Sequence, residues 1–216
     1  MNDERLRIRE IFYSLQGEAR DSGRPTVFIR LTGCPLRCRW CDTAYAFAGG
    51  DLLSVTAILA EVARHGTPWV CVTGGEPLAQ PAVHTLLQAL CAADYRVSLE
   101  TSGALPIHAV DARVSRVMDL KAPDSGECER NLLDNITDLR RHDQVKFVIA
   151  SQRDFAWSVA MTREHDLCRR VDDVLFSPVH AELDARQLAE WILASRLPVR
   201  MQMQLHKLLW NDEPGH

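Results

Sequence analysis

Short apolar segments alternate along the chain with segments whose apolar residues recur at helical spacing. The short segments are rich in β-branched residues, which is typical of strands buried on both faces of a parallel sheet. We therefore expect strands at residues 27–31, 69–73, 96–100, 116–120, 145–149, 174–177 and 199–204.

Apolar residues three and four positions apart predict helices between these strands. Val55, Ile58 and Val62 share one helical face, and Gly66 stands where such a helix would end. The same reasoning predicts helices at residues 83–91, 132–139, 154–168 and 184–194.

This alternation implies parallel strands joined by right-handed crossovers. Roughly six strand–helix units are fewer than a closed eight-fold barrel needs. We expect an α/β fold of the partial, open parallel β/α barrel type, with its ligand site at the carboxyl ends of the strands. No repeat, low-complexity stretch or long linker divides the sequence, so residues 1–216 are expected to form a single domain.

Composition narrows the possible functions. Hydrophobic residues make up 46% of the 216 residues, which is enough for a full core. The net charge of -4 and the pI of about 6.1 argue against direct binding of nucleic acid through phosphate neutralisation. No apolar run reaches the ~18 residues of a membrane span, and the charged first ten residues lack a signal-peptide core. We expect a cytoplasmic protein without a membrane partner.

Three of the seven cysteines lie close together in a loop that follows the strand at residues 27–31. Cys34, Cys38 and Cys41 have C-x3-C-x2-C spacing. Thiolates are the ligands of iron-sulfur clusters, and three of them leave one iron of a 4Fe-4S cluster open. S-adenosylmethionine (SAM) could chelate that iron. A structural zinc knuckle is the alternative, but zinc normally takes four protein ligands, and His65 and Cys71 are distant candidates.

Two further motifs follow strands. The turn Thr73-Gly74-Gly75-Glu76-Pro77 can bring backbone N–H and C=O groups close to a ligand, such as the methionyl end of SAM. The alternative is an ordinary tight turn between a strand and a helix. The segment Glu100-Thr101-Ser102-Gly103 is either a ligand-binding carboxylate at a strand end or a helix-capping turn.

The cysteine loop and the Gly-Gly-Glu-Pro turn together resemble the radical SAM superfamily. More narrowly, several motifs resemble the 7-carboxy-7-deazaguanine synthase family, in the same order and at similar intervals from about residue 8 to residue 207. They are Ile-Phe-Tyr-Ser-Leu-Gln-Gly-Glu at residues 11–18, Phe28-Ile29-Arg30, Cys41-Asp42-Thr43, Glu100-Thr101-Ser102-Gly103 and Gln204-Leu205-His206-Lys207.

The resemblance implies a lyase that converts 6-carboxy-5,6,7,8-tetrahydropterin into 7-carboxy-7-deazaguanine with loss of ammonia, on the route to 7-deazapurines such as queuosine. It implies a 4Fe-4S cluster, SAM and Mg2+ as cofactors. It also implies a homodimer and an external electron donor of the flavodoxin or ferredoxin type.

Residue roles follow from the same resemblance. An N-terminal segment at about residues 8–25 would bind the substrate, and a C-terminal tail would extend over about residues 205–216. The metal ligands would be Cys34, Cys38 and Cys41 for the cluster and Thr43 for magnesium. The substrate-binding residues would be Leu15, Gln16, Gly17, Arg30, Thr73 and His206, with Arg30 as a fork for the pterin carboxylate. SAM would be bound by Gly75, Glu76, Asp119, Leu120, Lys121, Ser177, Pro178, Val179 and His180.

Two features depart from the family pattern. Asp119-Leu120-Lys121 replaces Ser-Pro-Lys, and the chain continues beyond His206-Lys207, which leaves open whether the tail contacts substrate. A glycyl-radical enzyme activating enzyme is the alternative enzyme. An iron-sulfur electron carrier or a zinc-binding scaffold is the alternative without an enzyme activity.

Overall fold

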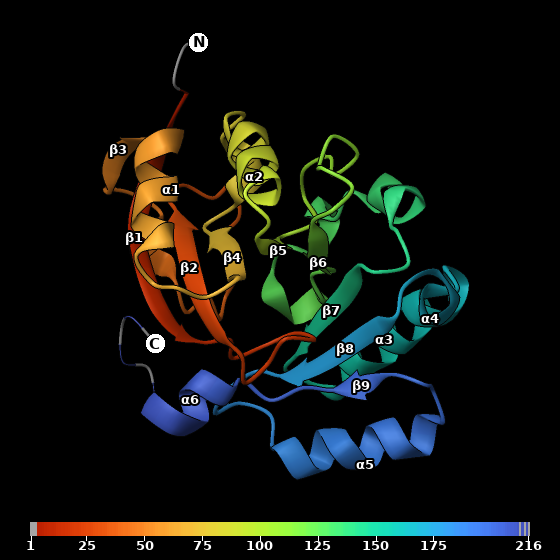
Figure 1. Cartoon of the computed structure of the whole chain (residues 1–216). Helices are drawn as coiled ribbons and strands as arrows, with labels where there is room; N and C mark the ends of the chain where they lie inside the picture. The colour runs from red at the N-terminus through yellow and green to blue at the C-terminus, as the bar shows by residue number, and fades with distance from the viewer. Residues whose placement is uncertain (1–3, 212, 214, 216) are drawn as a thin grey trace.

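The computed structural model describes residues 4–211, 213 and 215, and in them all strands belong to one nine-stranded sheet (Figure 1). The strand order is β3-β1-β2-β4-β5-β6-β7-β8-β9, so the sheet is open, with β3 and β9 at its edges. The strands are β1 (Arg5–Leu15), β2 (Pro25–Leu31), β3 (Asp51–Ser54), β4 (Trp69–Gly74), β5 (Arg96–Thr101), β6 (Ser115–Asp119), β7 (Gln144–Ile149), β8 (Asp173–Pro178) and β9 (Arg200–Met201).

From β2 to β9 every neighbouring pair of strands is parallel. The predicted open parallel arrangement is therefore confirmed. β1 and β3 are additions, because β1 runs antiparallel to both β2 and β3. The predicted strand at residues 199–204 is too long, since only Arg200 and Met201 pair with β8.

The two faces of the sheet differ in polarity. On β2, β4 and β5, alternate residues such as Val27, Ile29, Val72 and Leu99 are buried in a core shared with the helices α1 (Val55–Ala63) and α2 (Val83–Ala92). The residues between them face a cavity, and they include Phe28, Arg30, Cys71, Thr73 and Glu100. The apolar face thus holds the helices, and the opposite face presents polar groups.

Helices cover the outside of the curved sheet (Figure 1). Besides α1 and α2 they are α3 (Gln152–Glu164), α4 (Leu167–Arg170) and α5 (Ala185–Ser195), whereas α6 (Leu205–Trp210) lies at the cavity. The helix predicted at residues 154–168 is interrupted, because Asp166 adopts a left-handed conformation (φ 51°) between α3 and α4.

The helix predicted at residues 132–139 is wrong in type. This segment forms the 3-10 helix η5 (Leu133–Asp138), in which Leu133 is exposed and Asn135 is buried. The Asn135 side chain donates to the carbonyls of Gly103 and Leu105 and accepts from the backbone N–H of Ile107. The segment is therefore held by the buried Asn135 amide together with the core contacts of Ile136 and Leu139, without a regular α-helical face.

The loop between β1 and β2 enters the interior of the open barrel. Ala19, in the left-handed conformation, packs against Val117 and Leu175. The N–H of Ala19 donates to Oε1 of Gln202, and the next N–H along the chain donates to Gln144, the first residue of β7. This loop closes the interior at the end where the parallel strands begin.

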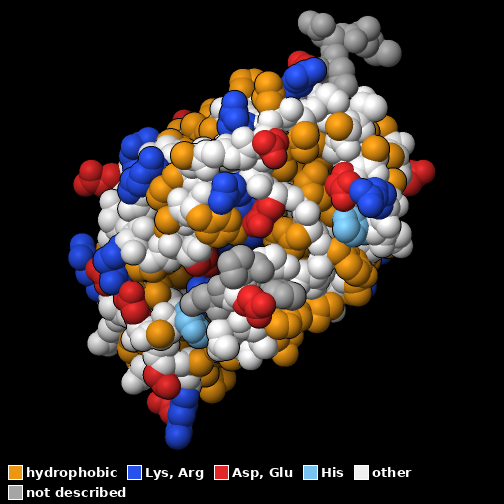
Figure 2. All heavy atoms as spheres, turned by 90° about the vertical axis from the view of Figure 1, so that its left-hand side faces the viewer, with side chains coloured by type: hydrophobic (Ala, Val, Ile, Leu, Met, Phe, Trp, Pro, Cys, Tyr) orange, Lys and Arg blue, Asp and Glu red, His pale blue; other side chains and the backbone are white. Residues whose placement is uncertain are grey.

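Figure 2 shows the face at the left-hand side of Figure 1, where charged side chains of both signs are interspersed with hydrophobic ones. Within the described part of the chain, no helix is both long and apolar enough to cross a membrane. The single domain at residues 1–216 stays a prediction, and residues 212, 214 and 216 of the predicted tail lie outside the described residues.

Candidate active site

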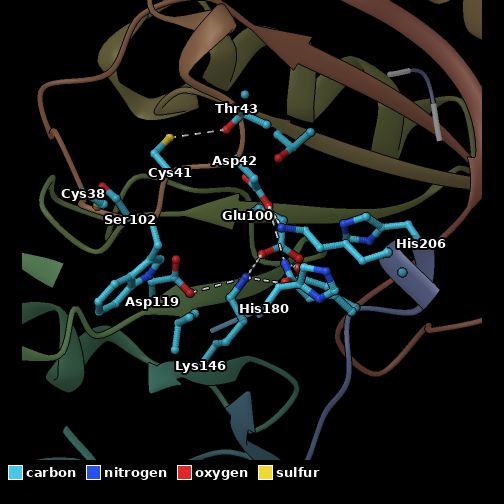
Figure 3. A pocket seen from close by; sticks show the side chains of 18 of the residues that line it. Cys38, Cys41, Asp42, Thr43, Glu100, Ser102, Asp119, Lys146, His180 and His206 are labelled. Atoms are coloured by element: carbon cyan, nitrogen blue, oxygen red, sulfur yellow. Dashed lines mark hydrogen bonds and ion pairs between the residues drawn. The ribbon is translucent and has the colours of Figure 1, made fainter. Parts of the chain in front are cut away.

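A cavity of about 710 Å³ occupies the interior of the barrel, between the cysteine loop and the loop that follows β1 (Figure 3). Its wall brings together most residues that the sequence predicts for the site. These are Leu15, Gln16, Gly17, Arg30, Cys34, Cys38, Cys41, Thr43, Thr73, Gly75, Asp119, Lys121, Val179, His180 and His206.

Four residues predicted to bind SAM are not among those that line the cavity: Glu76, Leu120, Ser177 and Pro178. All four are buried. The Glu76 carboxylate accepts hydrogen bonds from the backbone N–H groups of Leu78 and Ser102, and from the hydroxyls of Ser102 and Thr101. Glu76 therefore braces the turn from behind, because burial requires its oxygens to be paired with protein donors.

The cysteine loop lies directly against the glycine turn. A Cβ atom at Gly75 would lie 2.2 Å from the carbonyl oxygen of Gly33 and 3.0 Å from Cβ of Cys34. The N–H of Gly75 donates to Leu31 (3.1 Å), and the next N–H, that of Glu76, donates to Gly33 (2.7 Å). Glycine is thus required here by close backbone approach, and the two motifs form one continuous wall.

The three cysteines provide the soft thiolate ligands that an iron-sulfur cluster takes. Cys34, Cys38 and Cys41 are free thiols, each partly exposed toward the cavity. Burial raises the pKa of Cys34 and of Cys38. Among residues 4–211, 213 and 215, no three His, Cys, Asp or Glu side chains are grouped as ligands of one ion. The thiolates of a 4Fe-4S cluster each bind a different iron, so these three would leave one iron open.

Thr43 also lines the cavity, with its hydroxyl 3.8 Å from Sγ of Cys41. The neighbouring Asp42 carboxylate lies 3.4 Å from Nζ of Lys207 in α6. A hydroxyl oxygen at the cavity wall fits the predicted magnesium site, because Mg2+ accepts few protein oxygens and completes its shell with substrate and water.

Arg30 is anchored on one side only. Its Nε donates to the Glu10 carboxylate at 2.6 Å, and the Tyr45 hydroxyl donates to the same oxygen. The guanidinium carbon lies 5.5 Å from the ring centre of Phe12, which stacks on Phe28. Among the described residues, the terminal nitrogens of Arg30 have no hydrogen-bond partner, so both can bind a planar carboxylate side by side.

A network of buried charges lies deeper in the cavity (Figure 3). Nζ of Lys146 lies 2.7 Å from Glu18, 3.1 Å from Glu100 and 3.4 Å from Asp119. Asp119 also pairs with Lys121. These groups come from the loop after β1 and from β5, β6 and β7, so the fold assembles them from distant parts of the sequence.

The two glutamates of this network respond to it in opposite ways. Burial alone would raise the pKa of Glu18, but the charge and hydrogen bond of Lys146, together with Gln204, lower it to about 2. Burial raises the pKa of Glu100 to about 7, with Lys146 opposing the rise and the carboxylates of Glu18 and Asp119 adding to it. Paired carboxyl groups whose environments drive their pKa values apart are typical of functional sites.

The tail closes the cavity over the loop that follows β1. The N–H of Leu205 donates to the carbonyl of Gly17 at 2.9 Å, and Gln204 donates to Glu18 at 2.7 Å. A Cβ atom at Gly17 would lie 2.1 Å from Nδ1 of His206. Burial lowers the pKa of His206. The predicted substrate residues Gly17 and His206 are therefore in direct contact.

The sequence predicted no role for Lys146 or for the Glu18 side chain, whereas Glu100 was expected to be either a ligand-binding carboxylate or part of a helix-capping turn. One signal was available for Lys146, because a lysine between valine and phenylalanine in a strand otherwise buried is rarely without an ionic partner. The partners themselves were not foreseeable, since Glu18 lies 128 positions away in the chain.

Comparison with known proteins agrees with this geometry. Residues 28–120 match the radical SAM superfamily. A 7-carboxy-7-deazaguanine synthase from Chlorobaculum tepidum is 44% identical over 211 residues, which cover 96% of both chains. The protein of the same name from Methanospirillum hungatei is 40% identical over 94% of this chain and 85% of its own length. This chain belongs to the 7-carboxy-7-deazaguanine synthase family.

Solved structures support the fold of this family member. QueE from Escherichia coli superposes with a TM-score of 0.73 at 23% identity, covering 94% of this chain and 95% of that one. SuiB from Streptococcus suis, bound to S-adenosylmethionine, gives 0.58 at 15% identity over 80% of this chain and 48% of its own. The predicted radical SAM fold and family are confirmed, and the activating enzyme, electron carrier and zinc scaffold are not favoured.

Proposed function

We propose that this protein converts 6-carboxy-5,6,7,8-tetrahydropterin into 7-carboxy-7-deazaguanine and ammonia by radical ring contraction, as a carbon-nitrogen lyase of queuosine biosynthesis. The observation that carries this proposal is one cavity that joins three cysteines at its mouth to a polar interior of arginine, glutamate and lysine. The similarity of this chain, over nearly its full length, to proteins named for this activity also supports the proposal.

Cys34, Cys38 and Cys41 would hold the 4Fe-4S cluster, and the backbone around Gly75 would hold SAM. Together the bound cluster and SAM supply abstraction of a hydrogen atom from the substrate. Asp119, Lys121, Val179 and His180 extend the same wall and are the further predicted SAM contacts that line it. The role of the protein at this end is to position the reacting groups and to exclude water.

The substrate would occupy the polar interior. The free side of the Arg30 guanidinium would bind the pterin carboxylate. The Thr43 hydroxyl would be a ligand of magnesium, and the magnesium ion would bind the same carboxylate. Leu15, Gln16, Gly17, Thr73 and His206 would contact the ring system. The loop that follows β1 closes the far end.

The interactions with other proteins are also proposals. Large hydrophobic side chains are exposed on β1, β3 and α6 (Tyr13, Leu52, Leu208 and Leu209), and the face in Figure 2 carries hydrophobic groups among mixed charges. Such exposure supports a homodimer. An external donor of the flavodoxin or ferredoxin type would supply the electron.

The experiment is an anaerobic assay of the reconstituted protein with SAM, reductant, Mg2+ and the carboxy-pterin, with products identified by mass. We expect a product that has lost the mass of ammonia, together with 5′-deoxyadenosine. The Cys38→Ala variant should lose both products and the brown chromophore, whereas Cys168→Ala, a cysteine outside the cavity wall, should retain them. Cleavage of SAM without any change in the pterin would reject the proposed function but keep the superfamily.

A further inference from the structure

Lys146 lies at the centre of the cavity's charge network, and the family resemblance assigns it no role. We propose that Lys146 is a positioning residue for the substrate: its ammonium group holds Glu18 and Glu100 in place as acceptors for N–H groups of the bound pterin. This inference rests on the proposed function and names residues that would recognise the pyrimidine part of that substrate.

Lys146 donates hydrogen bonds to two carboxylates, those of Glu18 and Glu100, and forms an ion pair with a third, that of Asp119. Glu18, from the loop after β1, is nearest at 2.7 Å, Glu100 at the end of β5 follows at 3.1 Å, and Asp119 at the end of β6 lies at 3.4 Å. Lys146 itself is buried on the inner face of β7. A single ammonium group therefore sets the relative positions of three separate segments.

One oxygen of Glu100 remains without a partner. Lys146 binds Oε2, while Oε1 is buried and accepts no hydrogen bond from the described part of the protein. A buried acceptor without a donor is costly, and it is satisfied when a ligand supplies an N–H group. Glu100 lies on the cavity wall, as Figure 3 shows, so a bound ligand can reach it. The amino and ring N–H groups of a pterin are donors of this kind.

The charge balance explains why a lysine is needed at this position. Three carboxylates, Glu18, Glu100 and Asp119, face the two ammonium groups of Lys146 and Lys121. Other titratable groups of the described residues that face the network are Cys71 on β4, close to Glu100, His206 of α6, close to Glu18, and Cys38 of the cysteine loop, close to Asp119 and Lys121. Without Lys146 the carboxylates would repel one another, and Glu18 and Glu100 would each favour the protonated form.

The direction of the pH effect follows from this balance. Glu100 has a pKa of about 7, which the charge of Lys146 lowers from a still higher value. Removing that charge raises the pKa of Glu100. The ionised form, which is the stronger acceptor, then appears only at more alkaline pH. A merely structural lysine would leave the pH dependence of ligand binding unchanged.

The test measures binding of the carboxy-pterin to the reconstituted protein, with SAM and Mg2+ but without reductant, by calorimetry across neutral pH, together with kcat and KM of the same enzyme. For Lys146→Met we expect binding about 30-fold weaker or more, a rise in KM larger than the fall in kcat, and a binding midpoint shifted to higher pH. Lys146→Arg should restore part of the affinity. Arg64→Met, which removes an exposed cation paired with Glu61, is the matched control and should behave as the wild type.

Glu100→Gln keeps the shape of the side chain and provides a second test if Lys146→Met does not fold. We expect this variant to bind the pterin more weakly and to lose the pH dependence near neutrality. Unchanged affinity and an unchanged pH profile in Glu100→Gln, or in a folded Lys146→Met, would overturn the proposal. A uniform loss of SAM cleavage and pterin binding at every pH would also overturn it. Failure of the wild-type protein to bind the pterin at all would instead reject the proposed function.

Discussion

Replacement of Arg116 by methionine should lower the free energy of unfolding more than a surface substitution does. The reason is that the Arg116 side chain holds two connections between strands that contain no α-helix. The connections from β5 to β6 and from β6 to β7 contain no α-helix. The fully buried Arg116 guanidinium donates to the carbonyls of Ile107 (3.1 Å) and Asp138 (2.6 Å), one from each connection. It also pairs with the buried carboxylate of Asp143.

The magnitude follows from what the substitution leaves behind. Methionine retains much of the apolar volume, but the Asp143 carboxylate remains buried with only the backbone N–H groups of Arg116 and Arg140 as donors. Removing one partner of a buried ion pair costs about 3–5 kcal/mol. For a chain of this size that loss corresponds to a decrease in Tm of roughly 6–20 °C.

The assay is thermal unfolding of the cofactor-free protein followed by circular dichroism. The Arg116→Met, Asp143→Asn double variant should recover part of the lost Tm, because it removes the unpaired buried charge, while the single amide oxygen can still accept from one of the two backbone N–H groups. Arg113→Met removes an exposed arginine paired with Asp111 and should change the Tm little. An Arg116→Met protein that unfolds at the wild-type temperature would refute the reasoning that this ion pair holds the two connections.

Three further predictions concern close contacts in the site. Gly75→Ala should prevent stable cluster assembly, measured by iron content and the visible chromophore, because the new Cβ would overlap the Gly33 carbonyl; retention of a full cluster would contradict this. Gly17→Ala should displace His206 and raise KM for the pterin at least about tenfold while SAM cleavage persists, and an unchanged KM would count against the contact. Thr43→Ala should weaken activation by magnesium with the cluster intact; an unchanged magnesium titration would remove Thr43 from the metal site.

The sequence made the mouth of the cavity predictable because its chemistry is local. The spacing of three cysteines within eight positions predicts a cluster-binding loop, and two adjacent glycines predict a turn that approaches a ligand closely. Both motifs follow directly after strands. The parallel order of the sheet then brings the two loops together. The contact between the turn at Gly75 and the loop at Gly33 is a consequence of that order.

The interior was harder to predict because its polar residues are dispersed. The strands were expected to be buried on both faces, so Thr73 and Glu100 were noticed only as strand-end motifs, and Lys146 within its strand was not singled out. Their common orientation follows from the alternation of side chains along neighbouring strands in register. The sequence of β1 also contained a signal, because its buried residues Leu6 and Ile8 alternate with exposed arginines, as in a strand with one buried face. This strand was not predicted, because a highly charged chain terminus is also typical of a disordered segment.

The open side of the barrel connects closure of the cavity with recognition of the ligand. A sheet that ends at β9 leaves the interior accessible between that strand and the N-terminal hairpin. The loop after β1 and the tail fill this gap through the contacts of Ala19 with Gln202 and of Gly17 with Leu205. The same two segments supply Glu18 and His206 to the cavity wall. These residues therefore both close the site and line it. A ligand whose N–H groups bind Glu18 would also stabilise the closed arrangement, because a ligand stabilises the form of the protein to which it binds.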